Sequence, residues 1–376
     1  MMGNANRSAI RRVRTALSAT VVVCAVTAGL PGAASAQSTA VAAAAGVASD
    51  SGAGVERISV ATDGTQGDGD SAGASITTDG RRIVFMSSAK NLIPEDTTVG
   101  DRVFLRDQRT SQTKQMGAQS PLQPPVISGD GEYLAYPHVW MRNNRIRQVQ
   151  VRTTSEISAN CWYNCNQPSL SADGRYIALV ERNFKPQSSS QTIEILDYDD
   201  YNTKKAIANF GHTLPARPSI SGDGRFVAYQ DGKAEDVFVW DRTDGTTSGP
   251  IEGPSKAAAL VQLSEDGSKV VYLSGSDTYV HDMSSGTDQL VPNVRGVAID
   301  PTGRYLLYAP HDTTGPSLTL RDLETGTDDI VSNQPASAGT DAVSAGGRDV
   351  VFQSTADDIV PGDTNGKSDV FVRRFY

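Results

Sequence analysis

Two cysteines enclose two large aromatic side chains in the segment 161–165. Cys161 and Cys165 flank Trp162 and Tyr163. In an exported protein such a pair predicts a disulfide, which would stiffen a short loop. Aromatic rings on a stiff loop suit the anchoring of a protein partner or a sugar ring. The rings could equally fold back onto the body of the protein, because large aromatic side chains are often buried.

A second segment, 363–369, carries oxygen atoms of the kind that bind a hard cation. Asp363, Asn365 and Asp369 stand around a glycine at position 366. Carboxylate and amide oxygens at this spacing, with a glycine that permits a bend, resemble a short calcium loop. The alternative is a polar turn in which the same side chains cap their own backbone. We expect no cofactor, with calcium at this segment as the one alternative.

Aspartates recur at the ends of apolar runs, for example Asp107, Asp197 and Asp241. A pair of carboxylates is the usual equipment for glycoside hydrolysis. A catalytic pair is needed only once, however, whereas these aspartates return at regular intervals along the chain. We therefore expect them to form turns and not to carry out catalysis.

The charge of the chain is unevenly distributed. The 376 residues carry a net charge of −9, but the first 36 contain four arginines and no acid, so the rest carries −13. That charge argues against nucleic acid or anionic lipid as the main partner, because both would repel the chain. With 38% hydrophobic and 20% charged residues, the body is expected to be globular.

The N-terminus has the layout of a secretory signal peptide. Basic residues up to Arg14 precede an apolar stretch from Ala16 to Leu30, and the motif Ala-Ser-Ala follows. The stretch has 15 residues, whereas a bilayer-spanning helix needs roughly 20, so the alternative of an uncleaved membrane anchor is less favoured. We therefore expect cleavage after residues 1–36 and no membrane span in the mature chain. Residues 37–54, rich in Ala, Ser and Gly, predict a flexible linker. The mature protein is expected to be secreted or to reside in the cell envelope.

One phrase recurs seven times in residues 55–376: Ser or Thr, any residue, Asp-Gly, and then an apolar run, with two degenerate copies. Its glycines are Gly80, Gly131, Gly174, Gly224, Gly267, Gly303 and Gly347. A period of about 44 residues suits four short strands and their turns, the size of a propeller blade. Asp-Gly between apolar runs predicts a two-residue hairpin with a primed turn. We expect an all-β propeller with seven blades, or with six if a degenerate copy is miscounted.

The last repeat stops after its third strand. The segment 54–61, which precedes the first repeat, is predicted to be a strand and to complete the last blade. That closure would leave no exposed sheet edge. The face opposite the Asp-Gly turns carries the longer and more varied loops, and binding residues usually lie on such loops.

The phrase Ser-x-Asp-Gly-Arg, followed by an aromatic and apolar run, resembles the WD40-like repeat of TolB-type propellers. The segments 87–107 and 354–374 are similar to a signature of secreted TolB-like propeller proteins. This resemblance covers about 320 residues and implies the fold, whereas propellers host many unrelated activities. TolB itself has a further domain before its propeller, where this chain has the linker 37–54, so the resemblance does not extend to TolB's role.

Some propeller lyases with similar repeats use a metal site rich in histidine. His138, His212 and His311 are expected on the face with varied loops, but they come from three different blades. Packing or surface roles are therefore the plainer interpretation of these side chains. His281 falls within a predicted strand and is expected to be structural.

The leading functional hypothesis is a non-catalytic binding module that engages a protein or glycan of the cell envelope. Trp162 and Tyr163 are its expected anchors, with Trp140 and Arg182 as weaker candidates. No catalytic constellation is visible in the sequence. One alternative is a propeller enzyme, a lyase or glycosidase, that acts on polysaccharide. Another is a structural propeller whose loops are stiffened by calcium.

Overall fold

The computed structural model describes most of the chain after residue 53. The described ranges are 54–94, 100–117, 120–158, 164–185, 188–200, 204–211, 217–232, 235–311 and 315–375. Within these ranges no helix has the length and apolar character needed to cross a membrane. The helical content there is one short 3-10 turn, η1 (Ala345–Gly347).

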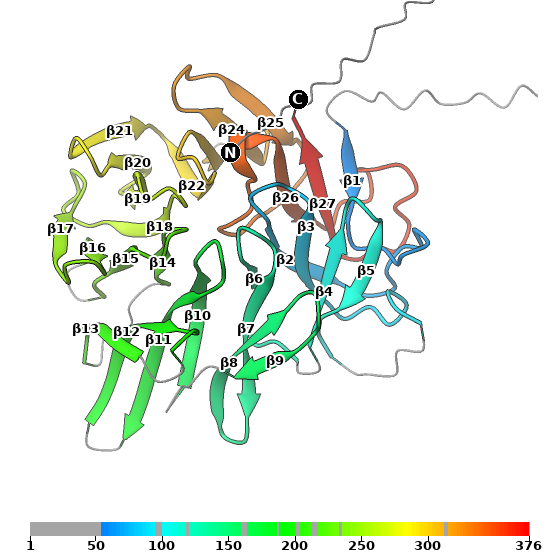
Figure 1. Ribbon diagram of the computed structural model, residues 1–376. Helices are drawn as coiled ribbons and strands as arrows, with labels where there is room; N and C mark the ends of the chain where they lie inside the picture. The colour runs from blue at the N-terminus through cyan, green and yellow to red at the C-terminus, as the bar shows by residue number, and fades with distance from the viewer. Residues whose placement is uncertain are drawn as a thin grey trace, which may run out of the picture. The chain divides into compact units, whose positions relative to one another are not determined.

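Seven antiparallel sheets stand around one centre (Figure 1). Blade 1 consists of β2 (Ser71–Ile76), β3 (Arg82–Ser87), β4 (Arg102–Asp107) and β5 (Gln112–Gln115). Blade 2 consists of β6 (Val126–Ile127), β7 (Tyr133–Trp140), β8 (Asn143–Gln150) and β9 (Glu156–Ser158). Blade 3 consists of β10 (Asn164–Leu170), β11 (Tyr176–Lys185), β12 (Ser188–Asp197) and β13 (Lys204–Asn209).

The next three blades repeat this order, with the first strand of each blade nearest the centre. Blade 4 consists of β14 (Ser219–Ile220), β15 (Phe226–Gln230), β16 (Val237–Asp241) and β17 (Thr247–Ile251). Blade 5 consists of β18 (Ala259–Leu263), β19 (Lys269–Ser274), β20 (Asp277–Asp282) and β21 (Thr287–Val291). Blade 6 consists of β22 (Val294–Ile299), β23 (Tyr305–Pro310), β24 (Leu318–Asp322) and β25 (Asp328–Ser332).

Blade 7 joins the two ends of the propeller. It contains β26 (Asp349–Ser354) and β27 (Asp369–Arg374), and β1 (Val55–Arg57) pairs with β27 as its outer strand. On the inner side, Val343 forms an isolated bridge with Val350. The prediction of seven blades closed by the N-terminal strand is confirmed, and the six-bladed alternative is wrong.

The core of the propeller lies between neighbouring blades. In β3, β15, β19 and β26, three consecutive residues are buried, because both faces of a middle strand are covered by adjacent sheets. Aromatic rings pair within the blades, as in the stack of Phe85 on Phe104, whose centroids are 5.9 Å apart. The result is a rigid ring from which loops and hairpins project.

The recurring Asp-Gly phrase forms a longer turn than its sequence predicts. In blade 1 the N–H of Thr77 donates to the carbonyl of Arg82, so four residues form the loop. Gly80 has a φ of +76°, but Asp79 does not have the positive φ that a primed turn requires. Asp79 instead accepts the N–H of Arg81 and the hydroxyl of Thr77. The expected two-residue primed turn is therefore wrong.

The aspartates at the ends of the third strands hold these turns from the side. Asp107 accepts hydrogen bonds from the guanidinium of Arg81, and Asp241 does the same for Arg225 in blade 4. Each of the two carboxylates also accepts main-chain N–H groups of the turn that follows it. The prediction that these recurring aspartates form turns is confirmed.

Candidate functional site at the channel mouth

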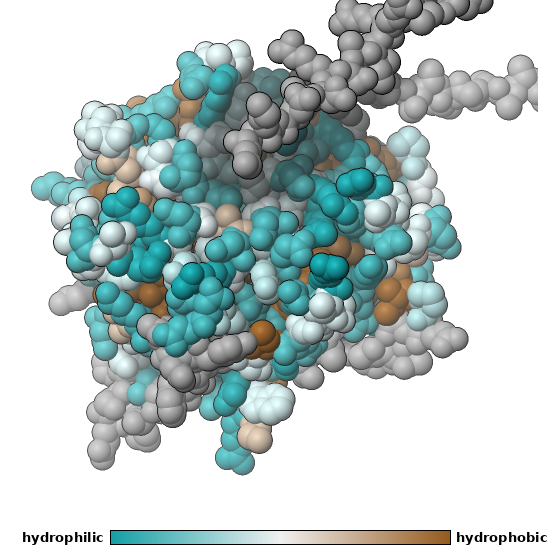
Figure 2. Space-filling view, in the orientation of Figure 1, coloured by the Kyte–Doolittle hydropathy of each residue, from teal (hydrophilic) through white to brown (hydrophobic). Residues whose placement is uncertain are grey.

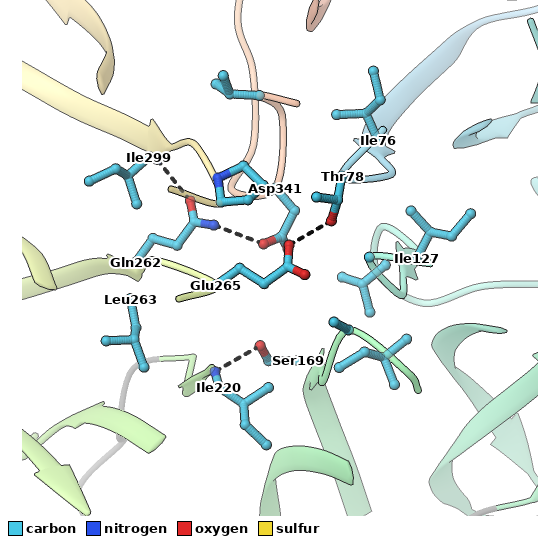
Figure 3. A pocket seen from close by; sticks show the side chains of 16 residues that line it. Ile76, Thr78, Ile127, Ser169, Ile220, Gln262, Leu263, Glu265, Ile299 and Asp341 are labelled. Atoms are coloured by element: carbon cyan, nitrogen blue, oxygen red, sulfur yellow. Dashed lines mark hydrogen bonds between the residues drawn. The ribbon is translucent and has the colours of Figure 1, made fainter. Parts of the chain in front are cut away.

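The innermost strands of the blades surround a central channel. Ile76, Ile127, Ile220, Leu263 and Ile299 line it from five different blades (Figure 3). These apolar side chains narrow the channel to a chamber of about 50 Å³, which has room for only a few water molecules. Any ligand larger than that has to be bound where the channel widens.

Glu265 places a carboxyl group inside this narrow chamber. It occupies the variable position of the Ser-x-Asp-Gly phrase in blade 5, where blades 2 to 4 have only Gly or Ala. Its Oε2 accepts a 2.6 Å hydrogen bond from the hydroxyl of Thr78 in blade 1, so the contact spans the channel (Figure 3). Burial raises the pKa of Glu265, and the charge of Asp341 adds to the rise, against the effect of the Thr78 hydroxyl.

Asp341 lies where the narrow chamber meets wider hollows. Its carboxylate forms an ion pair of 2.8 Å with Nη2 of Arg217, which precedes blade 4, on the far side of the ring from blade 7. It also accepts a 3.0 Å hydrogen bond from Nε2 of Gln262 in blade 5. Asp341 has a φ of +60°, a left-handed conformation that aspartate tolerates better than most residues. Such strain is often kept where a side chain must be aimed at a site.

Two hollows open beside Arg217 at this mouth. The larger one, of about 570 Å³, lies over blades 5 and 6 and has Arg217 and Arg295 as its only charged lining residues among those described. The smaller one, of about 270 Å³, lies over blades 1 to 3. Arg217, Gly339 and Thr340 line both hollows, so the Arg217–Asp341 pair stands between them and above the chamber.

Of the residues that the sequence proposes for binding, the structure describes Trp140 and Arg182, and neither lies at this mouth. Trp162, Tyr163 and Cys161 lie outside the described residues, so their anchoring role and the disulfide to Cys165 stay predictions. Cys165 is buried in β10. Trp140 is 42% exposed at the end of β7.

Arg182 lies on β11 in blade 3. Its Nε is buried without a hydrogen-bond partner among the described residues. Arg182 does not line any of the hollows described above, and neither does Trp140.

The proposed calcium residues contact protein cations and amides. Asp363 forms an ion pair of 3.2 Å with Arg57 of β1 and accepts a hydrogen bond from Gln66. Asp369 is fully buried, and its carboxylate accepts hydrogen bonds from the Ser59 hydroxyl and the Asn365 amide. These contacts tie the N-terminal segment to blade 7. A calcium ion would have to compete with Arg57, and calcium binding stays a prediction.

The described histidines lie apart from one another. His138 is buried in β7 with its Nδ1 near the carbonyl of Val139, and His311 contacts the carbonyl of Ser276. His281 faces Asp288 within blade 5, as expected for a structural residue. His212 lies outside the described residues. Where the chain is described, no three His, Cys, Asp or Glu side chains come close enough to hold a metal ion.

Sequence reasoning missed Glu265, Asp341, Arg217 and Arg295. They come from different blades, and only the folded ring brings them around one channel. One signal was available: Glu265 is the single acidic residue at the variable position of the Ser-x-Asp-Gly phrase. Comparing the copies by their differences, and not only by what they share, would have singled it out.

No protein-family model matches the chain, and no curated protein matches it. Among solved structures, an oligogalacturonate lyase in complex with manganese superposes with a TM-score of 0.64 at 14% identity. The lyase from Vibrio parahaemolyticus gives 0.63 at 14%. Both matches cover 87% of this chain and 94% of the lyase. TolB from Acinetobacter baumannii gives 0.49 at 17%, with 68% and 64% covered. At these identities the lyases show the propeller fold.

These comparisons correct the leading functional hypothesis. Two oligogalacturonate lyases match this chain over 94% of their length, so the polysaccharide-acting enzyme is the better supported alternative, and the expectation of a non-catalytic binding module is wrong. The expectation failed because the polar residues of the channel are far apart in the sequence. The manganese of the first lyase has no matching set of ligands among the described residues of this chain.

Proposed function

We propose that this propeller is an enzyme that cleaves an acidic oligosaccharide at the mouth of its central channel. The observation that carries the proposal is the placement of Arg217 and Arg295 in one hollow beside the carboxylate of Asp341. Support comes from the two matching structures, which are named for their action on oligogalacturonate, a polymer with one carboxylate on each sugar.

The two arginines suit the recognition of a sugar carboxylate. A guanidinium group presents parallel N–H donors that match the two oxygens of a carboxylate. Arg295 is exposed and has no acidic partner among the described residues, so it is available to a ligand. In a body that carries −13, two arginines on one hollow would draw an anionic substrate to this place. The apolar walls, which include Leu260 and Val297, suit the C–H faces of the sugar rings.

Elimination is the cleavage reaction that these groups suit. Arg217 and Arg295 would bind the substrate carboxylate and stabilise the negative charge that develops on it when the adjacent carbon loses a proton. Asp341, released from Arg217 by the incoming carboxylate, would accept that proton as a general base. The electron pair then forms a double bond in the ring, the bond to the leaving sugar oxygen breaks, and that oxygen takes a proton from water.

The test is a cleavage assay with oligogalacturonate, with a neutral oligosaccharide as comparison. Elimination produces an unsaturated sugar acid, whose ultraviolet absorbance reports the reaction. Arg295→Ala should lower the rate on the acidic substrate by at least about tenfold, the worth of a charge-assisted hydrogen bond. Arg109→Ala, which removes an exposed arginine from the turn after β4, is the matched control and should leave the rate unchanged. Equal rates for both variants would contradict the proposed site.

We also propose that the mature protein works outside the cytoplasm. The support is the layout of residues 1–36, where a basic segment, an apolar stretch and a small-residue motif follow one another as in a secretory signal peptide. Cell fractionation followed by N-terminal sequencing tests this proposal. A mature N-terminus at Gln37 in the medium or envelope fraction is expected, and a full-length cytoplasmic chain would contradict it.

A further inference from the structure

The hairpin of β7 and β8 in blade 2 ends in an exposed apolar tip. Val139, Trp140 and Met141 are 51%, 42% and 86% exposed. Leu122, 45% exposed, belongs to the chain segment that bonds to β7 next to this end, through its N–H and the carbonyl of Pro137. These four are most of the large apolar side chains exposed in the described part of the chain. Elsewhere, on the face seen in Figure 2, hydrophilic residues dominate and apolar ones form small separate patches.

The tip holds Met141 in a conformation that methionine does not favour. Trp140 pairs with Asn143, so the turn consists of Met141 and Arg142 alone. Met141 has a φ of +57°, where Gly, Asn or Asp would cost less free energy. A long apolar side chain kept at a strained and nearly fully exposed position indicates that the side chain itself has a use.

An aromatic contact at the end of β7 holds the tip in place. The indole of Trp140 lies edge-on to the imidazole of His138, with ring centroids 6.5 Å apart, and His138 is fully buried. Trp140 therefore stands on a packed base while its outer part remains exposed. A rigid tip loses little conformational entropy when it binds.

The hairpin is also basic, in contrast to the rest of the protein. Residues 133–150, which form the two strands and their turn, contain three arginines and no acid. Arg147 pairs with Glu156, but Arg142 and Arg145 have no ion pair among the described residues. At physiological ionic strength charges are screened beyond about 8 Å, so a surface that touches the tip responds to these arginines more than to the net charge of the chain.

We propose that this hairpin tip docks the propeller onto an anionic lipid bilayer. Successive residues of a strand point to opposite sides, so Val139 and Trp140 face different directions and Met141 caps the end. A flat sugar ring could stack on only one of these side chains, whereas a bilayer interface can take up the whole tip at once. Tryptophan at the lipid–water boundary and arginines beside acidic headgroups are the expected arrangement for such a contact.

The test is co-sedimentation of the full chain with phosphatidylcholine vesicles, with and without phosphatidylglycerol. Met141→Asn removes the apolar end while it favours the φ of the turn. It should lower binding to the anionic vesicles by about tenfold or more, and the unfolding temperature should stay the same or rise. Leu290→Asn, at a 49% exposed site on β21, is the matched control and should bind as the unchanged protein does.

Three results would overturn the docking proposal. One is an unchanged protein that fails to sediment with anionic vesicles at low salt. Another is a Met141→Asn variant that binds those vesicles as tightly as the unchanged protein. The third is retention on an immobilised polyuronate that Met141→Asn abolishes, without any vesicle binding, because the tip would then recognise acidic polysaccharide. None of these measurements depends on cleavage activity at the channel.

Discussion

At the residue scale, Asp341 is the side chain on which the proposed chemistry depends. It is held by Arg217 from across the ring and by Gln262 from blade 5, at a strained φ of +60°. The carboxylate of an incoming substrate can form the same ion pair with Arg217 that Asp341 forms. If the substrate carboxylate replaced Asp341 at Arg217, Asp341 would be free to accept a proton.

Asp341→Asn should therefore abolish most of the cleavage of an acidic oligosaccharide. Asparagine keeps the shape, the preference for positive φ and an oxygen for Gln262, but it cannot take up the proton. A positioned general base contributes about a hundredfold or more, so the rate should fall by that amount. Circular dichroism of the variant checks that the fold is retained. A variant with an unchanged rate would remove Asp341 from the reaction.

Glu265 gives a prediction for the pH dependence of stability. Because the pKa of Glu265 is raised above 4.5 in the folded state, the folded chain holds this proton more tightly than the unfolded chain does. Its contribution to stability is present at acid pH and is lost as the pH rises above 4.5 and through the raised pKa. Glu265→Gln keeps an oxygen that accepts the hydrogen bond of the Thr78 hydroxyl. Glutamine does not ionise, so the variant does not lose stability in this way as the pH rises. The unfolding temperature of Glu265→Gln should exceed that of the unchanged protein at about pH 8 and match it at about pH 4.

At the element scale, the Ser-x-Asp-Gly turns are places where two blades touch closely. Gly224 has a φ of +68°, and a Cβ added there would overlap the ring of Tyr176 in blade 3. Gly286 has a similar φ of +66°, but it faces open space in the turn after β20. The two glycines thus differ in packing and not in backbone conformation.

Replacing each glycine by alanine separates these two effects. Gly286→Ala should cost about 1–2 kcal/mol of unfolding free energy, from the left-handed backbone alone. Gly224→Ala should cost roughly 1–3 kcal/mol more, because the ring of Tyr176 must move. Urea unfolding of both variants measures the difference. Equal losses of unfolding free energy in the two variants would mean that the ring of Tyr176 moves aside without cost, and would contradict close packing of the two blades at this turn.

The seam between β1 and blade 7 depends on a buried ion pair. Arg57 and Asp363 have side chains that are 9% and 2% exposed, and Arg57 also approaches Asp369. Arg57→Met would leave these carboxylates without their cation, so we expect a loss of about 3–5 kcal/mol. Arg321→Met, which breaks a more exposed pair with Asp328, should cost no more than about 1 kcal/mol. Similar losses for the two variants in chemical unfolding would contradict the importance of the seam.

At the scale of the whole molecule, the repeat made the architecture predictable. Each copy carries the same apolar run and turn, so the blade number and the closure by β1 follow from local patterns repeated along the chain. The repeated patterns do not indicate the residues of the candidate site at the channel mouth. Arg217 and Arg295 are unremarkable in the sequence, and only the closure of the ring brings them to one hollow. The turn is longer than the dipeptide Asp-Gly predicts, because the Asp79 carboxylate accepts the N–H of Arg81 and the hydroxyl of Thr77.

The most direct test of the proposed function is analysis of the products of oligogalacturonate cleavage by mass spectrometry and ultraviolet absorbance. Elimination forms a double bond and adds no water, so we predict pairs of fragments of which one is unsaturated and absorbs in the ultraviolet, and their loss in Asp341→Asn. Saturated fragments only, whose masses together exceed that of the substrate by one water, would show hydrolysis and contradict the proposed role of Asp341. The absence of any cleavage of oligogalacturonate by the folded protein would contradict the proposed activity on this substrate.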